Sequence, residues 1–245
     1  MKNTFTALIH GASGAGKTYS ALQLPGTKIL LSTDGSYYYA AQFAKDLTIV
    51  DVTRWMRDKT GKEKCFSEQF DEAVAQLKPV AEKGNPACII VDNLSDLSDF
   101  AVLELKNSGQ NADFRRDYLL VQEAIRRLSR QALNCGVNVI FTAWTRTEER
   151  TQPNGEIVQH YEPQIPVKIL NSVCGLCNIV GMVSNKDVNG QVMYYYDLTG
   201  SDQLLAKDQI WGRKACLPTQ LFTPPAPPKA AQPKTTPAPK GGKSE

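Results

Sequence analysis

The sequence lacks the features that would place the chain in a membrane or outside the cell. It contains no apolar run of membrane-spanning length and no secretory signal. Its six cysteines are scattered, and neither a second cysteine pair nor a suitably placed histidine completes a four-ligand site around Cys174 and Cys177. We therefore expect a reduced, cytosolic protein without membrane contact, whose cysteines are ordinary buried thiols rather than zinc ligands or redox centres.

The main part of the chain also lacks a charge imbalance. The formal net charge of the 245 residues is +3, and residues 222–245 account for all of it with four lysines and one acid. Bulk charge therefore gives no argument that the rest binds nucleic acid. Half of the 14 prolines lie in the same segment, which cannot bury a core. We predict one domain over residues 1–221 and a disordered tail over 222–245, which aids solubility or contacts an acidic partner.

Apolar runs and helical periodicities alternate along the chain. Residues 17–24, 67–82 and 117–133 have the apolar spacing of helices, and seven runs have the length and composition of strands, at 5–10, 28–33, 48–52, 87–92, 137–143, 178–183 and 192–198. This alternation predicts an α/β fold with a mainly parallel central sheet and flanking helices, whose ligand lies at the carboxyl ends of the strands. The pair Asn189-Gly190 predicts an antiparallel hairpin at the C-terminal end.

The most informative segment follows the first apolar run and fits the phosphate-loop pattern G-x-x-x-x-G-K-[ST]. It comprises Gly11, Ala12, Ser13, Gly14, Ala15, Gly16, Lys17 and Thr18. The glycines let backbone N–H groups surround phosphate oxygens, and the following helix directs its positive end toward them. We predict that these residues bind a nucleoside triphosphate, with Lys17 as an exposed loop residue on the β- and γ-phosphates and the Thr18 hydroxyl as a Mg²⁺ ligand.

Two other apolar strands end in acids that suit the same chemistry. Asp92 ends the run 88–92 and is the candidate to contact the Mg²⁺ shell opposite Thr18. The next residue is Asn93 rather than glutamate, so a base that orients the attacking water is missing there. Asp34, at the end of the strand after the phosphate-loop helix, is our candidate base, and an Asp-Gly turn without a catalytic role is an equally good interpretation.

Polar and aromatic side chains end the strand predicted at 137–143. Thr142, Trp144 and Thr145 share the position at which a sensor of the γ-phosphate is expected. We take Thr142 and Trp144 as the sensor candidates, although Trp144 is equally suited to packing or to stacking on a base.

The order of these motifs resembles the core of the RecA-like P-loop ATPases. Residues 33–35 are similar to the turn that holds the catalytic glutamate of that family, and residues 89–97 to its Mg²⁺ strand. Over residues 4–218 the chain also resembles phage P-loop nucleotide-binding proteins, including the core-only single-strand annealing recombinases of the Sak-four type. The resemblance implies an ATP- and Mg²⁺-dependent ATPase in the cytoplasm of a bacterial host. It would bind single-stranded DNA as a homo-oligomer with ATP at subunit interfaces, with a single-strand DNA-binding protein as a candidate partner.

The resemblance also implies roles for particular positions. Residues 107–116 correspond to a first DNA-facing loop and residues 146–167 to a second, and the candidate DNA contacts there are Phe114, Arg115, Arg116, Arg146, Arg150 and, just beyond, Lys168. Lys207 matches a catalytic lysine that reaches the ATP of a neighbouring subunit, and a surface ion pair with Asp208 is the alternative. Asp34 is one methylene shorter than the glutamate of the family, and Trp144 replaces a switch glutamine, which implies slow hydrolysis or altered coupling to DNA.

Two alternatives remain open from the residues alone. Arg126, Arg127 and Arg130 fit the solvated face of their helix better than a binding surface. The same motifs also fit a nucleotide-gated adaptor or loader that escorts a replication protein and hydrolyses little ATP. A small-molecule kinase fits less well, because no arginine-rich lid is evident.

Overall fold

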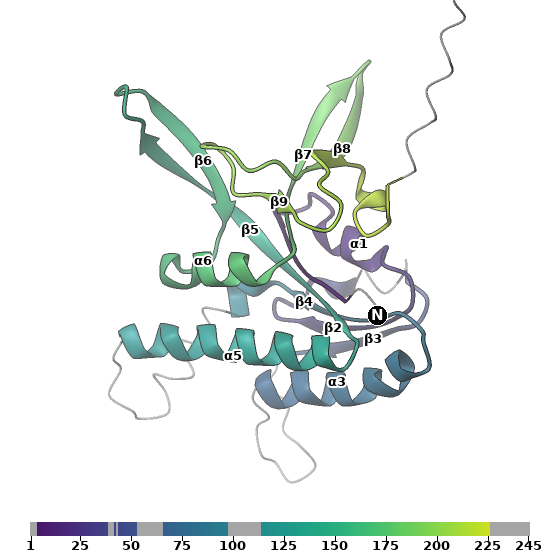
Figure 1. The fold of residues 1–245 in the computed structure, drawn as a ribbon. Coiled ribbons are helices and arrows are strands. Elements are labelled where there is room, and N and C mark those ends of the chain that lie inside the picture. Colours follow the sequence, from purple (N-terminus) through teal and green to yellow (C-terminus); the bar gives the residue numbers. More distant parts are fainter. Residues whose placement is uncertain (1–3, 39–41, 43, 53–65, 98–113, 226–245) are drawn as a thin grey trace, which may run out of the picture.

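The computed structural model describes residues 4–38, 42, 44–52, 66–97 and 114–225 (Figure 1). The described residues form ten strands that all belong to one sheet. They are β1 (Thr6–Gly11), β2 (Thr27–Ser32), β3 (Leu47–Asp51), β4 (Ala87–Asp92), β5 (Asn138–Thr151), β6 (Ile157–Pro163), β7 (Ile179–Val188), β8 (Gln191–Asp197), β9 (Lys207–Asp208) and β10 (Ala215–Cys216).

The strand order is β10-β8-β7-β1-β5-β4-β2-β3, with β6 paired to β5 and β9 paired to β7. The pairs from β7 through β1, β5, β4 and β2 to β3 are parallel, whereas β6, β8, β9 and β10 pair antiparallel. The predicted α/β class with a mainly parallel sheet is therefore confirmed. Because β5 lies between β1 and β4, the strand that leads into the phosphate loop does not touch the strand that ends in Asp92.

The α-helices with described bounds are α1 (Lys17–Leu22), α3 (Phe66–Glu82), α5 (Phe114–Asn134) and α6 (Val167–Leu176), and residues 94–97 are also helical. Figure 1 shows α3, α5 and α6 on one face of the sheet and α1 on the other. Successive strand residues alternate between the two cores: Leu8 packs with the residues of α3, α5 and α6, and Ile9 packs with those of α1. This burial on both faces explains why the parallel strands read as continuous apolar runs.

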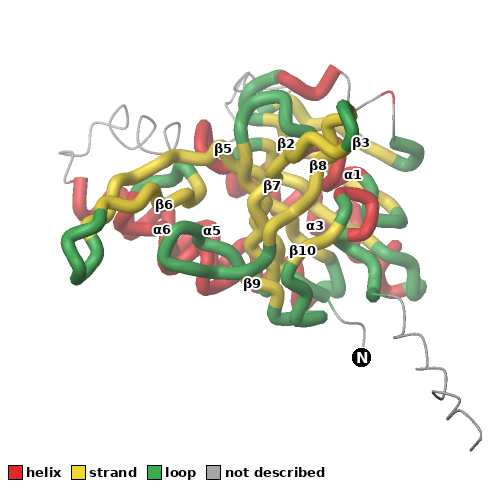
Figure 2. The backbone as a smooth tube through the Cα atoms, turned by 90° about the horizontal axis from the view of Figure 1, so that it is seen from above, coloured by secondary structure: helices red, strands yellow, loops and turns green. Residues whose placement is uncertain are grey.

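Two hairpins extend from the sheet in different directions (Figures 1 and 2). The β7–β8 hairpin turns at Asn189 and Gly190 with φ of 56° and 80°, as their sequence predicted. The β5–β6 hairpin was not predicted, and residues 146–167 are not a loop. They continue β5 to Thr151, return in β6 and enter α6 at Val167. The many charged residues of this segment hid the strand pattern, because such residues are depleted in strands.

The C-terminal end of the described chain closes the second core. Leu221 is fully buried, and the ring of Phe222 stacks on the ring of Phe5 with centroids 5.7 Å apart. Phe222, which we assigned to the tail, therefore packs with the domain. Residues 226–245 lie outside the described part, so the disordered tail stays a prediction. In the described ranges, no helix is both long and apolar enough to cross a membrane.

Candidate nucleotide-binding site

The phosphate loop leaves β1 at Gly11 and enters α1 at Lys17. Gly14 and Gly16 have φ of 74° and 84°, which L-residues with side chains rarely adopt. A Cβ atom at Gly11 would lie 2.2 Å from Cγ1 of Val183, so the packing of β1 on β7 leaves no room for a larger residue. The predicted cradle therefore has a steric reason for each of these three glycines.

Lys17 points back into this loop. Its Nζ donates to the carbonyl oxygens of Gly11 at 3.1 Å and Ala12 at 2.9 Å. Lys17 is the first residue of α1 and only 7% exposed, so its expected exposure as a loop residue was wrong. Burial lowers the pKa of its ammonium group, and the carboxylates of Asp92 and Asp34 partly oppose that shift.

Asp92 is the centre of the site. Its Oδ2 accepts a hydrogen bond from Thr18 Oγ1 at 2.5 Å, and its Oδ1 accepts one from Thr142 Oγ1. The residue is 4% exposed, and this burial raises the pKa of its carboxyl against the opposing hydrogen bonds and the charge of Lys17. The structure thus brings the predicted Mg²⁺ ligands and one sensor candidate together. Hydroxyl and carboxylate oxygens are the ligands that Mg²⁺ prefers, so these residues fit the ion.

Asn93 contributes to the site, a role that was not predicted from the sequence. Its backbone N–H donates to Thr33 Oγ1 at 2.7 Å, and the Thr33 hydroxyl donates to its carbonyl oxygen at 2.8 Å. This pair of bonds ties the end of β2 to the end of β4. The Asn93 side chain donates from Nδ2 to Asp34 Oδ2 and to Asp96 Oδ2, both at 3.1 Å. The sequence signal that could have identified Asn93 as a site residue was its position directly after Asp92.

Asp34 has the turn role that was one of the two interpretations left open by the sequence. Its Oδ1 accepts from the backbone N–H of Ser36 at 2.8 Å, as in an Asx turn. The residue is exposed and lines the same cavity as Lys17 and Asp92. One carboxylate oxygen therefore holds the turn, and the other, Oδ2, accepts from Asn93 Nδ2 at 3.1 Å, so the role of Asp34 as a base stays a prediction.

The cavity at the mouth of the loop has a volume of about 390 Å³. Trp144 lines it, half-buried, and its backbone N–H donates to Ser95 Oγ at 3.1 Å. Tyr19 and Ser36 also line it and were not predicted. Tyr19 is 42% exposed, so two aromatic residues, Tyr19 and Trp144, line the cavity. Two such rings suit stacking on a nucleotide base.

His10, one residue before the loop, was also missed. It is fully buried, and burial lowers the pKa of its imidazole to about 4, so the ring is neutral at physiological pH. Its Nε2 donates to the carbonyl oxygen of Leu205 at 3.3 Å, which leaves Nδ1 to accept from Thr145 Oγ1 at 2.9 Å. The ring thereby joins the loop strand to β5 at the base of the β5–β6 hairpin.

Lys207 does not line the cavity. It lies in β9 opposite Val180 of β7. The carboxylate of Asp208 accepts from Arg213 Nε at 2.6 Å, so the proposed ion pair between Asp208 and Lys207 is wrong. Lys207 has no carboxylate at ion-pair distance among the described residues.

Cys174 and Cys177 are buried free thiols, close enough to Lys207 for its charge to act on both. Burial raises the pKa of both thiols, that of Cys174 to about 12. They are protonated at neutral pH and unreactive, as expected for packing residues.

The arginines predicted to bind DNA from the β5–β6 segment already have a partner. Glu162 is 2% exposed and accepts from Arg146 Nε at 2.8 Å and from Arg150 Nη2 at 2.9 Å. His160 Nε2 lies 3.5 Å from the same carboxylate. Lys168 is exposed in the first turn of α6. The side chains of Phe114, Arg115 and Arg116, and all of residues 107–113, lie outside the described part.

The fold and the site together define a P-loop nucleoside triphosphatase of the α/β class. The family model described as an AAA domain matches residues 3–210, and the chain belongs to that family. The crystal structure of the flagellar accessory protein FlaH from Methanocaldococcus jannaschii is similar, at 15% identity over 86% of this chain and 83% of that chain, with a TM-score of 0.47. No curated protein matches the sequence.

Proposed function

We propose that the chain is a Mg²⁺-dependent ATPase of phage DNA recombination, which binds single-stranded DNA and promotes annealing or pairing of strands as an oligomer in the host cytoplasm. The observation that carries the ATPase part is the convergence of Lys17, Thr18 and Asp92 at one cavity, with Asp34 facing them. A phosphate loop alone binds phosphate, whereas a second acid placed across the cavity adds a base for hydrolysis.

Each residue of the cavity has a distinct task in this proposal. The Lys17 ammonium leaves its loop carbonyls for the phosphate oxygens, and the Asp34 carboxylate accepts a proton from the attacking water. Thr18 and Asp92 would hold Mg²⁺, which would withdraw charge from the phosphates when bound. Asn93 holds the Asp34 carboxylate through its side-chain amide and so sets the position of the base.

The recombination part of the proposal is supported by the order of the motifs, which resembles that of the annealing recombinases. Its oligomeric part is supported by Lys207, which is half-buried outside the cavity of its own chain. A lysine without an ion-pair partner among the described residues is available to the nucleotide of a neighbouring subunit.

A specific observation favours a second candidate, the nucleotide-gated adaptor or loader. Arg146 and Arg150 are bound to the buried Glu162, so they offer little free charge to a DNA strand. This feature would suit a protein that is gated by nucleotide and escorts a partner rather than pairing DNA strands.

Strand binding and annealing separate the two candidates. We expect a labelled oligo-dT to bind the full chain more tightly with Mg²⁺–ATP than without it, and two complementary oligonucleotides to anneal faster in its presence. Absence of both strand binding and annealing, in every nucleotide state, would favour the adaptor. For the shared site, Lys207→Ala should lose ATP-dependent oligomerisation and turnover together, and mixing it with Lys17→Ala should restore part of the turnover. A fully active Lys207→Ala protein would remove Lys207 from the mechanism.

A further inference from the structure

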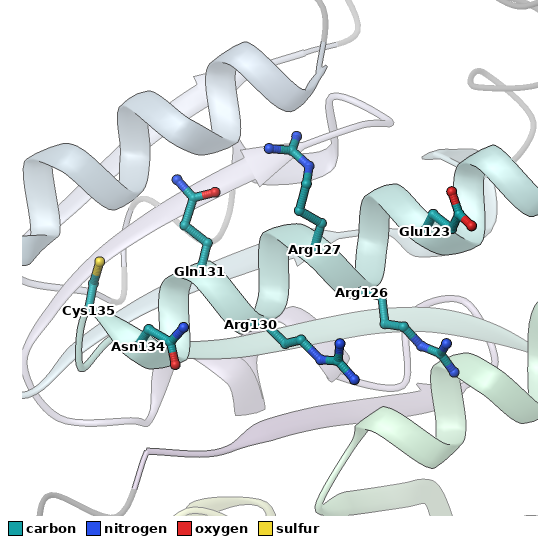
Figure 3. A pocket seen from close by; sticks show the side chains of 7 residues that line it. All are labelled: Glu123, Arg126, Arg127, Arg130, Gln131, Asn134 and Cys135. Atoms are coloured by element: carbon teal, nitrogen blue, oxygen red, sulfur yellow. The ribbon is translucent and has the colours of Figure 1, made fainter.

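The outer face of α5 carries a hollow of about 510 Å³ that no part of the ATPase mechanism uses. Figure 3 shows the side chains around it, with Arg126 and Arg130 on one flank of the helix and Arg127 and Gln131 on the other. Arg126, Arg127 and Arg130 are exposed and lie within two turns of the helix. Glu123 is the acid among the lining residues. We call this surface the α5 hollow.

The arginines whose side chains the structure describes fall into two groups. Arg146, Arg150 and Arg213 are held by the carboxylates of Glu162 and Asp208 inside the domain. Arg127 lies 4.0 Å from Asp71, at the limit of ion-pair distance, and the two side chains are 58% and 41% exposed, so this pair contributes little. Among the described residues, Arg126 and Arg130 have no carboxylate at ion-pair distance. Of the arginines with described side chains, those free to bind an anion are therefore concentrated in the α5 hollow.

The spacing and chemistry of the hollow suit a chain of phosphates. Arg126 and Arg130 are four residues apart, which places both guanidinium groups on the same side of the helix. Each group presents a fork of N–H donors that matches a phosphate oxygen pair. Gln131 and Asn134 add amide groups that can donate to sugar and phosphate oxygens. The tail of this chain is not a suitable occupant, because residues 222–245 are basic.

We propose that the α5 hollow binds the phosphodiester backbone of a single nucleic-acid strand. This inference rests on the proposed DNA-binding function and places the strand on α5 instead of the β5–β6 hairpin. The contact is with the backbone, so it is independent of base sequence and sensitive to salt. The hollow is lined entirely by α5 and the residue after it, so its loss leaves the nucleotide cavity intact.

The test uses the full chain with Arg126→Gln and Arg130→Gln together, because glutamine keeps the helix propensity and removes the charge. Binding of a labelled oligo-dT is measured over a series of salt concentrations. Each lost phosphate contact lowers the slope of log affinity against log salt by about 0.7 for a single strand, so we expect a decrease of about 1.4. The same relation gives a loss of affinity on the order of tens of fold at low salt, which disappears toward 1 M.

The matched control removes two exposed charges elsewhere, with Lys186→Gln and Lys214→Gln. It should keep the slope of the wild type, and both variants should keep the basal ATPase rate and the circular dichroism spectrum. An unchanged slope in the arginine variant, or weaker binding with an unchanged slope, would overturn the inference. Displacement of the strand by polyglutamate at lower charge concentration than by unlabelled oligo-dT would assign the hollow to an acidic protein and also overturn it.

The outcomes separate this inference from the proposed function. A wild-type protein that binds the strand through α5 but anneals nothing would overturn annealing and support the hollow. If the wild type and the arginine variant anneal strands with equal efficiency, annealing would be supported and the α5 hollow would be overturned as the strand site. A wild-type protein that binds no strand in any nucleotide state would overturn both.

Discussion

Asp92 and Glu162 are both buried carboxylates, at 4% and 2% exposure, but their hydrogen-bond and ion-pair partners differ. Glu162 receives two arginines, so its charge is compensated within the chain. Asp92 receives two hydroxyl groups, and burial raises the pKa of its carboxyl. Lys17 acts on Asp92 without forming an ion pair at close distance, and a buried carboxylate that is not fully compensated is costly and is typical of functional sites. The comparison therefore separates a ligand site from a structural anchor.

Lys17→Ala should have the largest effect, because it removes the cation that acts on Asp92 and on the phosphates. We expect turnover to fall by about 10³–10⁵-fold, the usual effect of removing a cation from a transferring phosphoryl group. Steady-state ATPase assays and nucleotide titration would measure the loss. Lys83→Ala, an exposed lysine after α3, is the control. Undiminished turnover and ATP affinity would remove the basis for calling the Asp92 region a nucleotide site.

Asp34→Asn should retain Mg²⁺–ATP binding and lose turnover by about 10²–10⁴-fold, because it preserves shape but not the basic carboxylate. Single-turnover hydrolysis and a separate binding titration distinguish the two steps. Asp187→Asn is the matched control, since Asp187 also accepts a backbone N–H, that of Gly190, in a turn. If Asp34→Asn hydrolyses ATP at the wild-type rate, Asp34 is a turn residue and the base lies elsewhere.

Glu162→Gln should have the opposite effect from the two variants above: it should lower the stability of the fold and leave turnover nearly unchanged. Removing one partner of a fully buried pair costs about 3–5 kcal/mol. Here Arg146 and Arg150 are 23% and 47% exposed, so we expect about 2 kcal/mol and a decrease in melting temperature of about 6 °C. Basal ATPase activity should stay within a few-fold. Glu149→Gln, exposed on the paired strand β5, should change stability by less than about 0.5 kcal/mol.

Asp92→Asn gives the smallest change in stability and the sharpest test of the comparison. A raised folded pKa means that the folded state holds the proton more tightly than the unfolded chain. The stability of the metal-free protein should therefore fall as pH rises from the ordinary carboxyl pKa through the raised one.

Asp92→Asn should remove that dependence in urea titrations at several pH values, together with thermal stabilisation by Mg²⁺–ATP. Asp202→Asn, at an exposed acid, should change neither. Strong destabilisation by Asp92→Asn at all pH values would make Asp92 a structural anchor like Glu162 and end the distinction.

Local sequence was sufficient for much of the fold and for part of the site. The phosphate loop, the strand ending in Asp92 and the Asn189-Gly190 hairpin each occupy one short segment, so their residues identify them without distant partners. The sequence did not show that Asn93 holds Asp34, because those residues come from β2 and β4 and meet only when the strands pair.

The β5–β6 hairpin shows the limit most clearly. Its arginines suggested a DNA contact, but the register places Arg146 opposite Glu162 and buries that acid. Whether a charge is free depends on which partner the register brings to it, and register is a property of the paired strands.

The sequence by itself determined the nucleotide cradle, because the φ angles and N–H groups of a phosphate loop depend on consecutive residues. It also determined the alternation of buried strands and amphipathic helices. Only the tertiary structure decided which charges are compensated: Asp92 receives two hydroxyl groups, Glu162 receives two arginines, and Arg126 and Arg130 face solvent without a partner among the described residues. The physical reason is that a Coulomb interaction depends on distance and burial, and both are set by contacts between segments far apart in the chain.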